Sequence, residues 1–440
     1  MQIKKIASST VIIETKDTSI LCDPWIENGE YYGSWSISEE LILRQNTYKE
    51  MNECENVYIS HIHPDHFSKK TLNKIEKNKK VFIHKYESPF LKKNLENLGF
   101  KNIVEVENGE TVQIKGKTNL TIFAADNCDP NICKKFMGCN YSDGSKKSQQ
   151  IDSCALIHDE KKTILNLNDC MEPMMNSTIK KIKNKFKIID ILLVNYNSAH
   201  SYPQNIANIT DEKKYQISEE IKKLTLSKTI KYLESIEPIF FIPFAGEYTI
   251  SGRNFPLNKF KGTNSQNECY DFFNESKWKK KLIMLNYGSK FDGSSKVNFR
   301  RDNELELREY NQKLVEMEYD YDFINTPSKS EIEDMSFLAF KKMMIKLNLK
   351  FNHILYIKYF DKLIFLDFDN NLIKFTKNTI EDKRDFTILE LDEKLLFLLL
   401  KGPKYAHWNN ADIGSHISYT RSDLLNYNYR LFNSISYFHC

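Results

Sequence analysis

The amino-acid sequence predicts an α/β fold with a smaller α+β domain at its C-terminal end. In the first 300 residues, short β-branched and apolar runs alternate with turns and with helix-like stretches. Several of these runs end in polar residues that begin a loop, which is where α/β enzymes carry their reactive groups. The chain has 440 residues, which is more than a single typical core needs. These observations favour one large domain with a second domain attached.

The expected elements of the large domain, residues 1–300, follow from apolar periodicity. Strands are expected within residues 9–15, 18–25, 56–60, 80–84, 102–106, 111–115, 120–126, 154–159, 162–169, 189–197, 237–244 and 282–288. Helices are expected within residues 69–78, 172–185 and 217–236.

The last part of the chain has a different composition. Residues 301–330 are charged and poor in apolar residues, which predicts a linking segment. Residues 331–440 then predict a C-terminal α+β domain. Its expected elements are an amphipathic helix at 335–349, strands at 353–359, 362–368 and 371–377, and an apolar helix at 393–401.

Composition excludes several classes of protein. Lys and Arg number 63 against 59 Asp and Glu, and the charges are interspersed, so neither nucleic acid nor a membrane surface is expected as a partner. The nine cysteines form no CxxC pair or zinc-finger spacing, which suits free thiols in a reducing cytoplasm. The sequence has no signal-peptide core and no long apolar window, so we expect a cytoplasmic protein.

The stretch HIHPDH, directly after the expected strand at 56–60, contains three of the ten histidines. Imidazoles and carboxylates are the usual ligands of divalent transition metals, and a loop leaving a strand can direct His61 and His63 toward one point. Asp65 and His66, turned by Pro64, could serve a second point nearby. The alternative is a polar surface loop, but the spacing favours metal binding.

HIHPDH and three further motifs carry a resemblance to a known family. HIHPDH resembles the signature of the metallo-β-lactamase superfamily. ILCDPW, residues 20–25, is similar to the branch that includes ascorbate-phosphate lactonases. ILNLNDC, at 164–170, and FIPFAGEY, at 241–248, resemble the metallo-β-lactamase-like part of CMP-N-acetylneuraminate hydroxylases. The likeness covers about residues 1–300.

The resemblance implies a fold and a set of roles. Residues 1–300 would form an αββα metallo-β-lactamase sandwich that holds one or two divalent metal ions at its edge. Asp169 would bridge the metals, and Asp23 would sit behind the ligands. Asp65 would be a ligand of the second metal, or the general base of a one-metal hydrolase.

The sequence lacks two histidines that the family pattern contains. In place of the first, at the end of the expected strand 120–126, it has carboxylates such as Asp126, and in place of the second, in PFAGEY, it has Glu247. We therefore expect Asp126 and Glu247 as additional ligands. A set this rich in oxygen favours iron, with zinc or manganese as alternatives. A Rieske cluster is not expected, since the sequence has no Cys-x-His pair to hold one.

Four residues are candidates for binding substrate. His200 follows the expected strand at 189–197, although a lone loop histidine is more often structural. Tyr248, Arg253 and Asn254 lie in a loop suited to a phosphate or carboxylate group, with an ordinary turn-rich loop as the alternative.

Three functions remain open from the sequence. The first is a metal-dependent oxygenase, a hydroxylase of a nucleotide-activated or otherwise anionic sugar, which would need a separate electron donor. The second is a zinc- or manganese-dependent hydrolase of a lactone, ester or phosphoester. The third is a non-catalytic binding protein on the same fold, which the intact HIHPDH motif and Asp169 disfavour.

Overall fold

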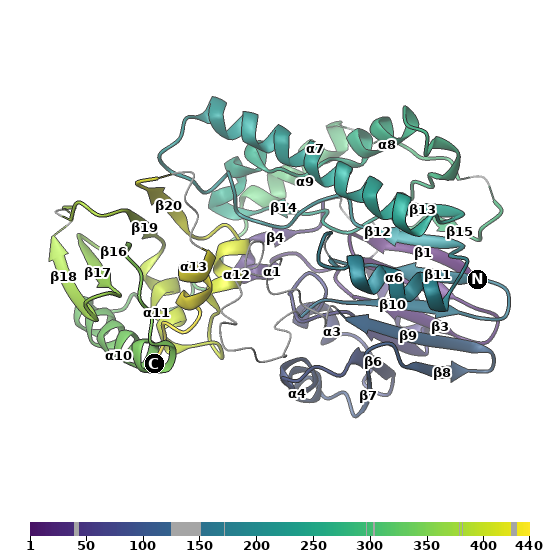
Figure 1. Cartoon of the computed structure of the whole chain (residues 1–440), viewed down its shortest axis with the longest axis horizontal. Coiled ribbons are helices and arrows are strands. Elements are labelled where there is room, and N and C mark those ends of the chain that lie inside the picture. Colours follow the sequence, from purple (N-terminus) through teal and green to yellow (C-terminus); the bar gives the residue numbers. More distant parts are fainter. Residues whose placement is uncertain are drawn as a thin grey trace.

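Two β-sheets packed face to face form the larger part of the molecule (Figure 1). The computed structural model describes residues 1–38, 44–124, 151–170, 172–295, 297–301, 304–377, 379–380, 382–423 and 429–440. The first sheet has the order β15-β1-β2-β3-β5-β6-β7, with β1 Gln2–Ala7, β2 Thr10–Glu14, β3 Ser19–Cys22, β5 Asn56–Ile59, β6 Lys80–His84, β7 Asn102–Val106 and β15 Lys290–Phe291. The second has the order β13-β12-β11-β10-β9-β8, with β8 Thr111–Lys115, β9 Thr118–Ala124, β10 Ser153–His158, β11 Thr163–Asn166, β12 Ile191–Val194 and β13 Phe240–Pro243.

Successive side chains of a strand point to opposite faces of its sheet. Because these strands have apolar residues at consecutive positions, both faces of each sheet are apolar. Val11 and Ile13 of β2 point into the cluster between the sheets, whereas Ile12 points to the outer face. In the second sheet Ile164 points inward, and its neighbour Leu165 points outward. Each sheet therefore needs a layer of helices on its outer face.

Helices supply those outer layers. On the first sheet lie α2 Arg44–Glu53, α3 Lys69–Leu72 and α4 Phe90–Asn97, and on the second lie α6 Asn176–Lys185, α7 Asp211–Ile236 and α8 Gln266–Asn274. Two short 3₁₀ helices, η1 Gly252–Phe260 and η2 Lys279–Lys281, follow β13. The predicted αββα sandwich is confirmed.

The C-terminal residues, 329–440, build a separate five-stranded sheet, here called the C-terminal unit. Its order is β18-β17-β16-β19-β20, with β16 Ile354–Tyr359, β17 Lys362–Asp367, β18 Leu372–Lys377, β19 Phe386–Glu390 and β20 Ser418–Arg421. Its helices are α10 Lys329–Leu347, α11 Glu393–Lys401, α12 Trp408–Ile413 and α13 Tyr429–Ile435. The unit has its own apolar cluster, in which Phe340, Ile357 and Leu399 are fully buried. The smaller α+β part is thus present, while the exact division at residues 300 and 331 stays a prediction.

The charged segment before the unit packs against both parts. It contains α9 Glu304–Val315, whose Tyr310 and Leu314 are buried in the outer cluster of the first sheet. Further on, Tyr319 and Tyr321 belong to the apolar cluster of the C-terminal unit. The segment thus contributes to two cores.

A small ribbon lies between the sandwich and the C-terminal unit (Figure 1). It consists of α1 Glu30–Gly33, β4 Trp35–Ser36 and β14 Thr249–Ile250, with β4 paired to β14. Helix α12 of the C-terminal unit packs against α1. This contact is important because α1 also reaches the metal centre described below.

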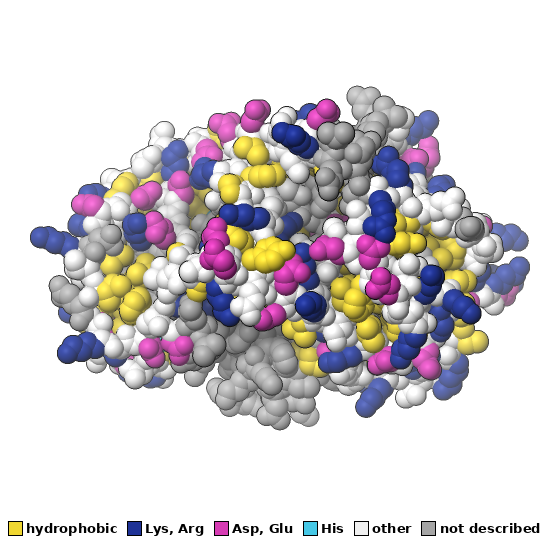
Figure 2. Space-filling model, turned by 90° about the horizontal axis from the view of Figure 1, so that it is seen from above, with side chains coloured by type: hydrophobic (Ala, Val, Ile, Leu, Met, Phe, Trp, Pro, Cys, Tyr) yellow, Lys and Arg dark blue, Asp and Glu magenta, His cyan; other side chains and the backbone are white. Residues whose placement is uncertain are grey.

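Across the described residues, no helix combines the length and the apolar character that crossing a bilayer would require. The face seen in Figure 2 carries basic and acidic side chains interspersed with one another.

Candidate metal centre

The HIHPDH loop leaves the carboxyl end of β5 and makes a tight turn. The backbone N–H of His66 donates to the carbonyl of His63 at 2.9 Å, with Pro64 and Asp65 at the two central positions. Proline favours this turn because its ring fixes the backbone dihedral that the second turn position requires. The turn brings Asp65 and His66 back beside His61.

Asp152 and Asp169 come from the hairpin of β10 and β11 in the second sheet. Ala155 pairs with Asn166 in this antiparallel hairpin, so Asp152, which precedes β10, and Asp169, which follows β11, lie at the same end of it. The hydroxyl of Ser153 donates to the carbonyl of Ser60 at 2.7 Å. This bond holds the end of β5 against the start of β10, so both carboxylates face the histidines.

Six side chains meet at this edge of the sandwich. The Nε2 atom of His61 lies 3.0 Å from His63 Nδ1, 3.6 Å from Asp152 Oδ1 and 4.0 Å from Asp169 Oδ2. The Nε2 atom of His66 lies 3.3 Å from Asp169 Oδ1 and 3.5 Å from Asp65 Oδ2. Two groups have ligand atoms within 4.8 Å of one another, namely His61, His63 and Asp152, and His61, His66 and Asp169. These groups can hold a divalent metal ion.

Asp23 and Ser60 determine which ring nitrogens face the centre. Asp23 Oδ2 accepts from the Ser60 hydroxyl at 2.7 Å and from His66 Nδ1–H at 2.8 Å. Because the Ser60 hydroxyl proton goes to Asp23, its oxygen accepts from His61 Nδ1–H at 2.9 Å. Both histidines therefore point an Nε2 atom at the centre, with Asp23 behind them. This is how carboxylates orient metal-binding imidazoles.

The surroundings of the His66 Nε2 atom indicate whether a cation fits at the centre. His66 Nε2 is buried and makes no hydrogen bond within the described structure. A buried polar atom without a partner is costly, so its position beside Asp65 and Asp169 is explained by a cation that all three would share.

Electrostatics at the centre favours a positive charge. Burial disfavours the imidazolium of His66, but the charges of Asp169, Asp65 and Asp23 outweigh it and raise its pKa well above the usual value. Burial, and after it the charge of Asp169, raises the pKa of Asp152 to about 7. Without a cation the cluster thus retains protons, and a divalent ion would neutralise the same carboxylates.

His61 differs from His66 in its protonation. Burial lowers the pKa of His61 well below its usual value, and the neighbouring His66 and His63 lower it further. The ring is therefore neutral, which is the form that binds metal.

Two of the expected ligands are not part of the described cluster. Asp126 lies outside the described residues. Glu247 is buried elsewhere, and its carboxylate pairs with Lys5 Nζ at 2.5 Å and accepts from the Tyr196 hydroxyl at 3.0 Å and from Gln266 at 3.2 Å. The expectation that Glu247 is a ligand is corrected, because its oxygens are used by this internal network.

Two of the four residues expected to bind substrate make hydrogen bonds between distant parts of the chain. Arg253 donates to Asp322 at 2.9 Å and to Asp392 at 3.3 Å, and Asn254 donates to the carbonyl of Ser415 at 2.8 Å. Both side chains therefore attach the C-terminal unit to the sandwich, and their role in binding an anion stays a prediction.

His200 and Tyr248 occupy different surroundings. His200 lies 3.2 Å from the Ser198 hydroxyl, and burial lowers its pKa. Tyr248 stacks on Trp35 with ring centroids 3.5 Å apart, and its pKa is raised by burial and then by the charge of Asp65. Tyr248 is thus near the centre, and its binding role stays a prediction.

Asp152 is the candidate ligand that sequence reasoning missed. It lies two residues before the start of the apolar run 154–159, and Asp169 ends the following run. Treating these two runs as one hairpin would have placed the two carboxylates side by side.

Solved structures that align with this chain include two enzymes. CmlA, a diiron β-hydroxylase from Streptomyces venezuelae, is 15% identical and aligns with a TM-score of 0.42 over 66% of this chain and 53% of that chain. The isothiocyanate hydrolase from Delia radicum gut bacteria is 12% identical and aligns with a TM-score of 0.44 over 66% of this chain and 98% of that chain.

Curated relatives are similar along the first part of the chain. A protein named as a Rieske 2Fe-2S iron–sulfur protein of Mycolicibacterium smegmatis is 25% identical over 248 residues, which cover 56% of this chain and 43% of the relative. The inactive cytidine monophosphate-N-acetylneuraminic acid hydroxylase of Homo sapiens is 24% identical over 271 residues, which cover 61% of this chain and 49% of the relative. The chain thus spans less than half the length of these relatives.

The family model of the beta-lactamase superfamily domain matches residues 2–137, a range that includes the HIHPDH loop. Together with the αββα sandwich and the similarity to the hydroxylases, this match agrees with the resemblance seen in the sequence. The match over residues 2–137 and the αββα sandwich therefore support the resemblance of this chain to the metallo-β-lactamase superfamily.

Proposed function

We propose that this protein is a metal-dependent oxygenase of the hydroxylase type that uses iron at the candidate metal centre. The observation that carries the proposal is the position of Asp152, whose carboxylate lies 3.6 Å from His61 Nε2 and groups with His61 and His63. Three imidazoles then share the centre with three carboxylates, a harder set than the imidazole-rich sites that suit zinc. Hard, oxygen-rich ligands favour iron or manganese.

The residues of the centre have separable tasks in this proposal. His61, His63 and Asp152 would hold one ion, and Asp65, His66 and Asp169 the other, with Asp169 also within 4.0 Å of His61. Bound iron would supply redox chemistry with dioxygen. Asp23 would keep His66 oriented and basic.

The substrate class rests on the relatives. Several are named cytidine monophosphate-N-acetylneuraminic acid hydroxylases, so we propose a nucleotide-activated or other anionic sugar. Arg253 no longer supports this choice, since Asp322 and Asp392 already neutralise it.

Electrons for such a reaction would come from a separate donor. The sequence in hand has no Cys-x-His pair for a Rieske cluster, whereas other relatives carry the name of Rieske iron–sulfur proteins. We propose that a separate protein reduces the centre.

A metallohydrolase is the second candidate, and the position of Asp65 favours it. Asp65 belongs to neither of the two ligand groups found among the described residues, and it lies beside them. Burial raises the pKa of its carboxylate, as suits a general base. In this candidate Asp65 would take a proton from a water that attacks a lactone, ester or phosphoester.

One experiment separates the two candidates. The protein is purified without added metal, its metals are measured by elemental analysis, and reduced protein is mixed with dioxygen. Iron with dioxygen consumption supports the oxygenase. Zinc or manganese, with turnover of phosphorylated lactones and no dioxygen consumption, supports the hydrolase and contradicts the first proposal.

A further inference from the structure

A strained loop lies next to the candidate metal centre. Tyr31 and Tyr32 adopt left-handed backbone conformations, with φ of 49° and 61°, between Gly29 and Gly33, whose φ values are 85° and 96°. For a bulky non-glycine residue such a conformation is strained, and it persists only where the surroundings enforce it. Two such residues in succession raise the question of what the loop accomplishes.

The loop delivers a phenol to Asp65. The Tyr31 hydroxyl donates to Asp65 Oδ1 at 2.5 Å, and Tyr31 is 2% exposed. Its ring packs on Trp35 with centroids 4.5 Å apart. The hydrogen bond occupies one oxygen of Asp65 and leaves Oδ2 facing His66 at 3.5 Å.

The C-terminal unit enforces the loop conformation. His416 Nε2 lies 2.7 Å from the carbonyl oxygen of Tyr31, which can only accept, so the nitrogen is the donor. His416 Nδ1 then accepts from the Tyr321 hydroxyl at 2.9 Å. Burial lowers the pKa of His416 to about 4, which is consistent with this neutral tautomer. The next residue is held as well, because the backbone N–H of His407 donates to the Tyr32 hydroxyl oxygen at 2.7 Å.

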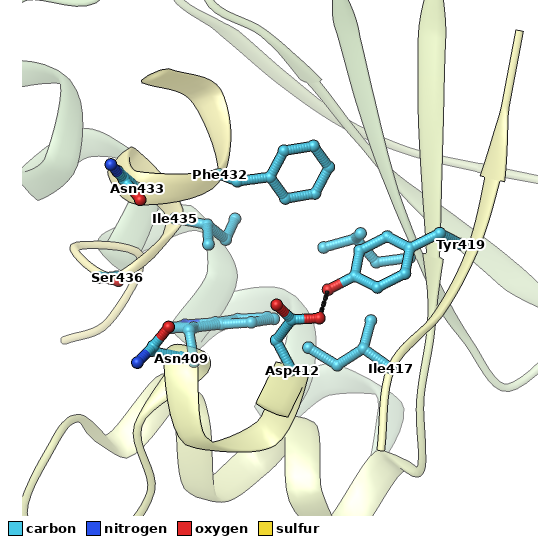
Figure 3. A pocket seen from close by; sticks show the side chains of 10 residues that line it. Asn409, Asp412, Ile417, Tyr419, Phe432, Asn433, Ile435 and Ser436 are labelled. Carbon is cyan, nitrogen blue, oxygen red and sulfur yellow. Dashed lines mark hydrogen bonds between the residues drawn. The ribbon is translucent and has the colours of Figure 1, made fainter. Parts of the chain in front are cut away.

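Helix α12, between these two histidines, is itself fixed in place. Its Asp412 accepts from the Tyr419 hydroxyl of β20 at 2.7 Å (Figure 3). Asp412 also accepts from the hydroxyl of Ser201 in the sandwich. A cavity of about 70 Å³ lies beside Asp412 within the unit and contains none of the histidines of the centre. The same helix brings the Asn409 amide to 3.3 Å from His63 Nε2. The C-terminal unit therefore reaches the centre at two points.

We propose that the C-terminal unit completes the metal centre, with His416 acting as a positioning residue that fixes Asp65 through Tyr31. This inference rests on the proposed metal centre and adds a role for the second part of the chain. Asp65 lies in the sandwich, but its orientation depends on a hydrogen bond from residue 416 to the backbone of residue 31. Movement of the C-terminal unit away from α1 would release Tyr31 and change how the second ion is held.

The test measures metal affinity rather than catalysis. Metal-free wild type, Tyr31→Phe, His416→Ala, the double variant and His416→Gln are titrated with Co²⁺ by calorimetry and by absorption. Loss of an orienting partner weakens metal binding by roughly 10- to 100-fold. We expect this loss for one of two ions in Tyr31→Phe and His416→Ala, and no further loss in the double variant. His416→Gln should restore affinity, since a glutamine amide can donate from about the position of Nε2.

A matched control breaks an exposed ion pair of the C-terminal unit away from the contact with α1. Lys329→Gln removes the ion pair to Asp361 and leaves Tyr31 and His416 untouched, so Co²⁺ affinity should not change. Wild-type affinity in Tyr31→Phe, or additive losses in the double variant, would overturn the inference while leaving the metal centre intact. A wild-type protein that binds no Co²⁺ would instead overturn the proposed centre, and the inference with it.

Discussion

At the residue scale, the proposed preference of the centre for iron depends on Asp152. Its carboxylate groups with His61 and His63, so Asp152→Asn should weaken binding of one ion by more than the roughly 10- to 100-fold that loss of an outer partner costs. Metal stoichiometry and Zn²⁺ affinity measure the effect. Asp159→Asn, at the other end of the same strand, is the control and should bind like wild type. Unchanged metal content in Asp152→Asn would mean that Asp152 is no ligand.

Glu247 provides the converse prediction at the same scale. The side chains of Lys5 and Glu247 are 0% and 4% exposed, and breaking a buried ion pair costs about 3–5 kcal/mol because one charge is left without its partner. Glu247→Gln should therefore lower the free energy of unfolding by about that amount and leave metal stoichiometry unchanged. Replacing both residues, with Lys5→Met and Glu247→Leu, should recover most of the loss in denaturant titration. Loss of metal from Glu247→Gln would return this carboxylate to the ligand set.

Spacing along the sequence predicted those candidate ligands that share one loop or end a strand. The structure groups His61, His63, His66 and Asp169, with Asp65 beside them. Asp152 could not be recognised in the same way, because its place depends on pairing between two strands rather than on a local motif. Arg253 shows the opposite difficulty, since nothing local to it reveals that Asp322 and Asp392, far along the chain, neutralise it.

At the scale of elements, the loop from Glu30 to Gly33 should make stability depend on pH. Burial raises the pKa of Glu30 from 4.5 to about 7, although the Ser68 hydroxyl donates to it at 2.6 Å. Between about pH 4.5 and 7 the folded protein keeps a proton that the unfolded chain has lost, so stability falls as pH rises through this window.

The size of this effect is measurable in metal-free protein. The free energy of unfolding should fall by roughly 2–3 kcal/mol across the window, and Glu30→Gln should remove that contribution. Glu96→Gln, at an exposed position on α4, is the control and should keep the wild-type slope. A Glu30→Gln variant with the same pH dependence as wild type would show that Glu30 is not protonated in the folded state.

Apolar periodicity predicted most strands of the sandwich. It failed where pairing with a distant segment determines whether an apolar run forms a strand. The apolar run 282–288 was expected to be a strand, but within it only Leu282 bridges to Phe241. The segment crosses from the edge of one sheet to the edge of the other, where the N–H of Gly288 donates to the carbonyl of Lys5, so it follows neither edge for long. Strands β19 and β20 were missed because their place depends on pairing with distant segments: β19 pairs with β16, and β20 pairs with β19.

At the scale of the whole molecule, the two parts of the chain meet beside the candidate metal centre. Residues 304–321 contribute to both cores, and α12 contacts α1 next to Asp65. The charged composition of residues 301–330 predicted a linker. Composition alone cannot show that Tyr310 of this segment enters one core while Tyr319 and Tyr321 enter the other. The C-terminal unit is thus placed to influence chemistry at the edge of the sandwich.

Elemental analysis of the wild type and of a His61→Ala, His63→Ala double variant tests the central claim most directly. Both proteins are purified without added metal, reloaded with Fe²⁺ under anaerobic conditions and desalted, and folding is checked by circular dichroism. The account predicts two ions per wild-type chain, with iron retained in preference to zinc, and at most one ion in the double variant. A wild-type protein that retains no metal, or a double variant that retains as much as wild type, would contradict it.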